Sequence, residues 1–372
     1  MHIYEHKFVH MKINLTTEMS SMNERLNQLI AQIKPLDEQA IQSAIEHQNQ
    51  LTKPPGSLGV LEQVAIQVAG ITGEVKPQFE KKAVIVMAGD HGVCEEGVSA
   101  FPSEVTPQMV YNFLRGGAAV NVLSREAGAD VVCVDIGVNA DLDDLKLVSR
   151  KVRKGTANMA KGPAMSREEA ISAVLVGVDI VEQYVREGYR LFSTGEMGIG
   201  NTTASAAMLC AFTGMEPEEA VGHGTGIGDA QWKHKCNVVR QALEINAPNR
   251  EDALDVLAKV GGLEIAGLTG VILAAAANQV PVVIDGFISS AAALAAVRLA
   301  PAVQPYLIGS HLSEERGHTA LLSELKLNPC LHVQMRLGEG TGGVLMFQLI
   351  DAAVRIMREM ATFAEAGVTN KE

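Results

Sequence analysis

The residues of this chain that best suggest chemistry lie near its C-terminus, in QMRLGEGTGGVLMF (residues 334–347). Gly338, Gly340 and Gly343 spell G-x-G-x-x-G, the spacing of a loop that cradles the pyrophosphate of a dinucleotide. Glu339 stands inside this pattern, although a carboxylate is a poor neighbour for a pyrophosphate. The stretch therefore predicts either a dinucleotide cradle or a general base mounted between glycines.

The position of the motif decides between these two interpretations. A dinucleotide fingerprint needs a second strand and an acidic residue about 20 positions further on. Residues 344–366 instead read as one amphipathic helix, and no strand follows. We therefore expect the glycines to project Glu339 from the end of a strand over 331–335, as a general base.

A second glycine loop, TGEMGIGNTTASAAMLCAF (residues 194–212), runs from a strand into a helix. Its glycines leave backbone N–H groups free, and Asn201, Thr202, Thr203 or Ser205 supplies a cap, so the loop predicts an anion nest. It is not a P-loop, because no Gly-Lys-Ser/Thr follows. Glu196 is unexpected inside such a nest, and the alternative is that it only caps the helix.

A third loop, VGHGTGIGDAQWKHKCNVVRQAL (residues 221–243), leads into a helix with Asp229 as the expected N-cap. The helix carries Lys233, Lys235 and Arg240. One lysine facing the anion would suit a phosphate or carboxylate ligand, whereas a charge on a helix is more often exposed to solvent.

Two further loops carry acids, hydroxyls and histidines. In VVIDGFISSAAALAA, Asp285 ends a strand and suits hydroxyl recognition, and the turn after it suits an anion. An alternative function of these acids and histidines is to bind a metal ion, although their spacing matches no recognised ligand pattern. The candidate ligands are His311, Glu314, Glu315 and His318, or Asp90 and His91.

The elements that must position these loops alternate between short β-branched runs and Ala-rich helices, which predicts a Rossmann-like α/β fold. Such a fold has a parallel sheet of about six strands with helices on both faces. Loops beyond the strand ends then share one edge of the sheet, although each alone also fits a simple tight turn. The expected strands are Ala83–Ala88, Val131–Ile136, Arg190–Ser193, Val280–Ile284, Tyr306–Ile308 and Leu331–Met335.

The composition limits the class of protein. The chain has 372 residues with a net charge of −12 and no basic cluster, which argues against nucleic-acid binding. Five scattered cysteines fit reduced thiols in the cytoplasm, and no apolar run reaches membrane-spanning length. We expect a disordered extension over 1–22, followed by a helical N-terminal layer.

Six motifs of this chain, in the order in which they occur, resemble those of the nicotinate-nucleotide:dimethylbenzimidazole phosphoribosyltransferase family. This family prepares the lower ligand of cobalamin. The resemblance covers the chain after about its first 20 residues. It implies a Rossmann-like catalytic domain over 81–343, a small helical domain from both chain ends over 23–80 with 344–372, a homodimer and no cofactor or metal. The motifs are KPPGSLG (53–59), MAGDHGV (87–93), TGEMGIGNTT (194–203), DGFI (285–288), GSHLSEERGH (309–318) and RLGEGTGG (336–343).

The resemblance also implies the reaction and the residues. The family moves the 5-phosphoribosyl group of nicotinate mononucleotide onto a ring nitrogen of 5,6-dimethylbenzimidazole, with inversion, giving α-ribazole 5′-phosphate and nicotinate. Glu339 is then the general base that removes the benzimidazole proton, and Leu337 lines the base pocket. The other substrate-binding residues implied are Glu196, Met197, Gly198, Asn201, Thr202, Gly224, Lys235, Asp285, Gly286, Phe287, Ser313 and Gly338.

Two other functions are alternatives to this one. An NAD-dependent oxidoreductase depends on the G-x-G-x-x-G motif, whose position argues against it. A non-catalytic nucleotide-binding module needs no glutamate on two separate glycine loops. The preferred acceptor base stays open, because residues 97–109 lie near it by the family pattern and Phe101 there affects the pocket.

Overall fold

The protein is built around one six-stranded sheet in which every neighbouring pair of strands is parallel. The structure, a computed structural model, describes residues 19–370 except residue 225. The strand order is β3-β2-β1-β4-β5-β6. The strands are β1 Lys82–Gly89, β2 Asp130–Gly137, β3 Val148–Ser149, β4 Leu191–Met197, β5 Val282–Ile284 and β6 Leu307–Gly309.

Both faces of the sheet are buried, as its central strand shows. Along β1, Ile85 and Met87 belong to one hydrophobic cluster, whereas Val84 and Val86 belong to the other. Side chains alternate between the two faces of a strand, so a strand that is apolar throughout needs a helical layer on each side. This confirms the predicted Rossmann-like α/β class.

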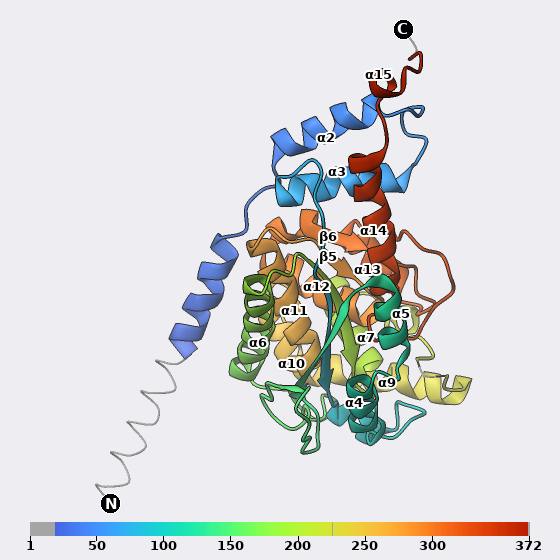
Figure 1. Cartoon of the computed structure of the whole chain (residues 1–372). Helices are drawn as coiled ribbons and strands as arrows, with labels where there is room; N and C mark the ends of the chain where they lie inside the picture. Colours follow the sequence, from blue (N-terminus) through green and yellow to red (C-terminus); the bar gives the residue numbers. More distant parts are fainter. Residues whose placement is uncertain (1–18, 225, 371–372) are drawn as a thin grey trace, which may run out of the picture.

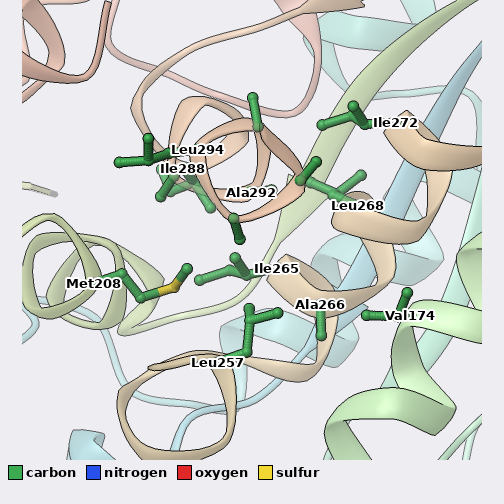
Figure 2. Packing of buried hydrophobic residues seen from close by; sticks show 14 of the residues in the cluster. Val174, Met208, Leu257, Ile265, Ala266, Leu268, Ile272, Ile288, Ala292 and Leu294 are labelled. Atoms are coloured by element: carbon green, nitrogen blue, oxygen red, sulfur yellow. The ribbon is translucent and has the colours of Figure 1, made fainter. Parts of the chain in front are cut away.

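The helices form these two layers. One face carries α6, α11 and α12, with α7 and α10 beyond them, and the other carries α4, α5 and α14. Figure 2 shows Ile265 of α11 beside Met208 of α7 and Ala292 of α12. The longer helices are α2 Glu38–Gln50, α3 Val60–Thr72, α4 Val105–Arg115, α5 Ala119–Ala127, α6 Arg167–Arg186, α7 Asn201–Thr213, α9 Asp229–Asn246, α10 Ala253–Val260, α11 Leu263–Ala277, α12 Phe287–Leu299, α13 His318–Leu325 and α14 Thr341–Glu359.

Segments from the two ends of the chain lie together. Helices α2 and α3 pack on each other, α3 packs on α14, and Leu51 pairs with Thr362 in an antiparallel bridge (Figure 1). Helix α14 also contacts β4 and β5, so its first half belongs to the main body. The division into domains at 23–80, 81–343 and 344–372 stays a prediction.

Two predicted elements differ from the structure, and one strand was not predicted. Leu331–Met335 is not a strand: it makes a single parallel bridge from Leu331 to His311, and Gln334 has a φ of +56°, which extended strands do not adopt. Helix α14 ends at Glu359 rather than continuing to 366, and a short α15, Phe363–Ala366, follows. The two-residue strand β3 at the sheet edge was missed, because so short a run carries no pattern.

Other predictions concern the chain start, the cysteines and the membrane. Residues 1–18 of the expected extension lie outside the described residues, whereas 19–31 are helical. All five cysteines are free. Within residues 19–370, residue 225 apart, we find no helix that combines the length and the apolar character needed to cross a bilayer.

Candidate active site

A cavity of about 490 Å³ lies at the edge of the sheet where the strands end. It is formed by the loops after β4, β5 and β6, by the segment before α14, and by residues around 98–109. All of the predicted site residues line it, so segments far apart in the sequence meet as expected for strand-end loops of a parallel sheet. They are Glu196, Met197, Gly198, Asn201, Thr202, Gly224, Lys235, Asp285, Gly286, Phe287, Ser313, Leu337, Gly338 and Glu339.

Glu339 is held between two glycines in an unusual backbone conformation. Its own φ is +64°, and Gly338 and Gly340 have φ values of +85° and +93°. A Cβ atom on Gly338 would lie 2.2 Å from Glu196 Oε1, and one on Gly340 would lie 2.4 Å from Val84 Cγ2. Glycine is therefore required on both sides of the glutamate by sterics as well as by φ.

The Glu339 side chain lies in the wall of the cavity and is only 6% exposed. Its Oε2 accepts a hydrogen bond from Val120 N at 3.4 Å, in the first turn of α5. Burial raises the pKa of Glu339, and the Val120 N–H opposes this effect. A carboxyl group with a raised pKa suits proton abstraction near neutral pH. We predicted that the end of a strand over 331–335 projects Glu339. This prediction was wrong, because residues 331–335 form a loop.

Glu196 lies near the end of β4 rather than in a loop beyond it. Its Oε2 accepts a hydrogen bond from Asn201 Nδ2, and its Oε1 lies 3.4 Å from Glu339 N. It does not cap α7, whose N-cap is Gly200 without a side-chain cap, so the predicted cap by a nearby hydroxyl is also wrong. Burial, with Asp285 and Glu264 nearby, raises the pKa of Glu196 to about 8.

The anion nest before α7 is partly filled by the protein itself. Ile199 N donates to Thr106 Oγ1 at 3.1 Å, and Asn201 N donates to Gly198 O at 3.1 Å. Gly198 passes so close to β1 that a Cβ atom there would lie 2.3 Å from Gly89 O. Gly198 therefore serves close backbone packing, and anion binding by this loop stays a prediction.

Lys235, on α9, is the lysine that reaches the cavity. It is 1% exposed, and its Nζ donates to Thr202 Oγ1 at 2.8 Å. Burial lowers its pKa to about 8, although the nearby Glu315 opposes this effect. Lys233 instead lines a neighbouring cavity. The predicted N-cap Asp229 is the first residue of α9, and Gly228 is the N-cap.

Among the acidic residues that line the cavity, Asp285 accepts the most hydrogen bonds. Its Oδ1 accepts hydrogen bonds from Gly342 N at 2.8 Å and Gly343 N at 3.1 Å, and its Oδ2 accepts one from Gly340 N at 3.1 Å. Burial raises the pKa of Asp285, while His311 and these three N–H groups oppose the effect. The glycine motif near the C-terminus thus does cradle an anion, which is a carboxylate of the same chain.

The histidines of the alternative metal site have other partners. Ser313 N donates to His318 Nδ1 at 2.9 Å, and His318 Nε2 lies 3.0 Å from Ser290 Oγ. Burial lowers the pKa of His318 to about 3, so the neutral ring donates from Nε2 to Ser290. In the described part of the chain, His, Cys, Asp and Glu form no group of three or more that could hold a metal ion.

Asp90 and His91, the other metal candidates, line a neighbouring cavity rather than this one. His91 Nε2 is 2.6 Å from Glu264 Oε1, and both side chains are almost fully buried. Asp90 Oδ2 accepts a hydrogen bond from Asn139 N at 2.7 Å. No pattern in the sequence indicated Glu264, because it lies inside an otherwise apolar helix.

Several cavity residues were not among the predicted set. Arg336 Nη1 donates to Gly224 O at 3.2 Å, so a second cation lies beside the loop that Lys235 also approaches. Phe101 also lines the cavity and is 51% exposed, like the predicted residue Leu337, which is 58% exposed. An arginine before a glycine motif was the available signal for Arg336. The further lining residues are Val98, Ser99, Val105, Met109, Ile199, Gly200, Ile288, Ser289, His311 and Glu315.

Comparison with known proteins agrees with this architecture. The phosphoribosyltransferase family model matches residues 33–368 of the chain. The nicotinate-nucleotide-dimethylbenzimidazole phosphoribosyltransferase of Chloroflexus aggregans is 58% identical over 93% of this chain and 99% of its own length. The one from Geobacter sulfurreducens is 55% identical over 92% of this chain and 98% of its own length.

A solved structure of the same enzyme type, from Thermus thermophilus, has a TM-score of 0.86 and 46% sequence identity. The match covers 90% of this chain and 100% of that one. The similarity therefore extends over the sheet and its strand-end loops as well as the sequence. The chain belongs to the nicotinate-nucleotide-dimethylbenzimidazole phosphoribosyltransferase family.

Proposed function

We propose that this chain transfers the 5-phosphoribosyl group of nicotinate mononucleotide to a ring nitrogen of 5,6-dimethylbenzimidazole. The products are α-ribazole 5′-phosphate and nicotinate, and the anomeric centre is inverted, in assembly of the nucleotide loop of cobalamin. Relatives that carry this name are similar to the chain over nearly its full length. The single observation that carries the proposal is the meeting of Glu339 and all of the predicted nucleotide-binding residues in one cavity.

Glu339 acts as the general base in this reaction. Formation of the new C–N bond makes the benzimidazole cationic unless its N–H proton is removed, and a carboxylate within reach removes it. Support comes from the burial of Glu339 in the cavity wall and from the direction of its pKa shift, which brings the carboxyl group closer to neutral pH.

The leaving group needs no acid. The nicotinate ring nitrogen is formally cationic in the nucleotide, so cleavage of the C–N bond neutralises the ring. The ribosyl carbon gains positive charge, and Glu196 lies where it can stabilise that charge as a carboxylate. Glu196 is largely protonated at pH 7 in the empty cavity because its pKa is about 8, and the formally cationic ring nitrogen of the substrate favours its ionisation.

The phosphate is bound at the side of the cavity that faces Gly224. Lys235 and Arg336 both approach this residue, and Thr202 contributes a hydroxyl beside Lys235. In a protein with a net charge of −12, such local cations are what hold an anionic ligand. The acceptor base lies on the apolar side, against residues such as Met109 and Leu337.

We also infer a homodimer in the cytoplasm, as the family resemblance implies. The five free cysteines support a reducing compartment. Exposed apolar side chains at the cavity mouth, Phe101 and Leu337, support burial against another molecule. Light scattering of the purified chain tests the dimer, and a monomeric mass at assay concentration contradicts it.

Chromatography tests the activity itself. The purified chain is mixed with nicotinate mononucleotide and dimethylbenzimidazole, without added metal, and nicotinate release is followed. Release together with α-ribazole 5′-phosphate is the expected result. No release at any of several pH values overturns the proposal, and reduction of a nicotinamide cofactor by an alcohol or acid would favour the oxidoreductase instead.

A further inference from the structure

The carboxylate of Asp285, at the end of β5, is buried against the N-terminus of α14. The N-cap residue of this helix, Gly340, directly follows the general base Glu339. Asp285 is 2% exposed, and its two oxygens accept the N–H groups of Gly340, Gly342 and Gly343 at 2.8–3.1 Å. The first N–H groups of a helix lack partners within the helix and carry partial positive charge. Helix α14 has no side-chain cap from its own N-cap residue, so Asp285 supplies the missing acceptor.

The main chain of Asp285 is fixed as firmly as its side chain. Asp285 N donates to Thr194 Oγ1 at 3.2 Å, and Ser310 Oγ donates to Asp285 O at 2.6 Å. These partners come from β4 and from the residue after β6, on either side of β5. The carboxylate is therefore a rigid point that ties α14 to the edge of the sheet.

The glycines allow α14 to approach this point. A Cβ atom on Gly342 would lie 2.0 Å from His311 Nδ1, and one on Gly343 would lie 1.8 Å from Ser193 Oγ. Any side chain at either position would push the helix away from the strand ends. Gly340 then follows Glu339 directly, so the peptide between them is fixed by its hydrogen bond to Asp285.

We propose that Asp285 is a positioning residue for the general base: it fixes the Glu339–Gly340 peptide and so sets where the Glu339 carboxylate points. Both of its oxygens are engaged by the main chain, which leaves it poorly placed to bind a ribose hydroxyl. The proposal deepens the transfer reaction proposed above and rests on it.

The charge of Asp285 gives the proposal a second, electrostatic consequence. The groups that act on the Glu339 carboxyl group are the Asp285 carboxylate after β5 and the Val120 N–H at the start of α5. Glu196 from β4 lies against the main-chain N–H of Glu339, and His311 from the loop after β6 lies beside Asp285. The negative charge of Asp285 favours the protonated form of Glu339 and so raises its pKa. Removing the charge of Asp285 should therefore make Glu339 ionise at lower pH.

The test compares Asp285→Asn with wild type and with Asp135→Asn, a matched control. Asp135 is also a buried aspartate at a strand end: its Oδ1 accepts from Val138 N at 3.0 Å and its Oδ2 pairs with Lys151 Nζ at 2.8 Å, outside the cavity. In D285N we expect kcat to fall by about 10²-fold with little change in KM for nicotinate mononucleotide. We also expect the acid limb of the kcat profile to shift to lower pH. In D135N both should match wild type.

Wild type must first show transfer, and its failure would count against the proposed function rather than against this inference. If wild type is active, a D285N enzyme with unchanged kcat and acid limb overturns the inference. A rise in KM of about 10²-fold with normal kcat also overturns it, because Asp285 would then bind substrate. If D285N does not fold, Ser310→Ala loosens Asp285 while keeping its charge: a lower kcat with an unshifted acid limb supports the inference, and an unchanged kcat overturns it.

Discussion

The backbone N–H of Glu339 points at the carboxylate of Glu196, with 3.4 Å between Glu339 N and Glu196 Oε1. The contact joins the end of β4 to the segment before α14, and the two residues are 143 positions apart in the chain. Two glutamates in one cavity therefore have different surroundings, since Glu196 accepts from Asn201 and Glu339 faces the start of α5. Such differences separate the roles of paired carboxyl groups.

Replacing the base should stop turnover without preventing substrate binding. In Glu339→Gln the amide keeps the size of the side chain but cannot accept the benzimidazole proton. We expect kcat to fall by about 10²–10⁴-fold, the range that general-base catalysis supplies. Calorimetry with nicotinate mononucleotide should give a Kd close to wild type, and the exposed Glu104→Gln serves as control. Activity near that of wild type would show that another group takes the proton.

The glycine after the base should tolerate no side chain. Gly340→Ala places a Cβ atom 2.4 Å from Val84 Cγ2 at a φ of +93°, so the segment carrying Glu339 must move. A shift of about 1 Å costs roughly 10²-fold in rate. The control is Gly214→Ala, with a φ of +76° and no atom within 4 Å. It should lose about 1–2 kcal/mol of stability through φ alone but keep kcat. Equal kcat values for the two variants would contradict the steric argument.

Much of this site was predictable from the sequence, because glycine loops after β-branched runs must meet at one edge of a parallel sheet. Glu339 was found through the glycine motif around it, because the segment after that motif has the pattern of a long amphipathic helix rather than of a βαβ unit. The hydrogen-bond partners of Asp285 were not predictable from the sequence. Its acceptor role depends on the main chain of Gly340, Gly342 and Gly343, and backbone N–H groups leave no trace in side-chain types.

The errors have a similar origin. Leu331–Met335 has the composition of a strand, but it lies past the last sheet strand. It makes one isolated bridge, from Leu331 to His311, and Gln334 turns the chain at a φ of +56°. Local propensity predicts the extended shape of such a segment, whereas pairing depends on what the rest of the chain places beside it. Arg336 was missed for the same reason, because its contact with Gly224 is set by packing.

Nucleotide affinity should weaken as pH rises through about 8. Lys235 has a pKa of about 8 in the empty protein, so it is charged below that pH and neutral above it. A charge-assisted hydrogen bond to phosphate is worth about 1.5–3 kcal/mol. Lys235→Met should therefore raise the Kd for nicotinate mononucleotide by about 10–100-fold at pH 7, and its Kd should depend less on pH than that of wild type.

Lys233→Met is the matched control for this measurement. Lys233 lies on the same helix, is exposed and faces the neighbouring cavity. Its variant should keep both the Kd of wild type and the rise in Kd above about pH 8. If Lys233→Met weakened binding as much as Lys235→Met, the effect would come from net charge rather than from a phosphate contact.

The stability of the empty protein should fall between about pH 5 and pH 8 because of Glu196. Its pKa is about 8 in the folded protein against 4.5 for an ordinary glutamate, so the native state holds a proton that the unfolded chain has released. Protons bound more tightly by the native state stabilise it at low pH, and this contribution is lost as pH rises through the folded pKa. The loss for a fully buried group is on the order of a few kcal/mol.

Glu196→Gln isolates this contribution, because the amide resembles the protonated acid and does not titrate. Other buried acids such as Glu315 also have raised pKa values, and they remain in both proteins, so they cancel in the difference. The free energy of unfolding, measured in urea from about pH 5 to pH 8, should fall more steeply for wild type than for Glu196→Gln. Exposed Glu104→Gln should follow wild type. Parallel curves for Glu196→Gln and wild type would mean that Glu196 is already ionised in the empty cavity and needs no substrate to become a carboxylate.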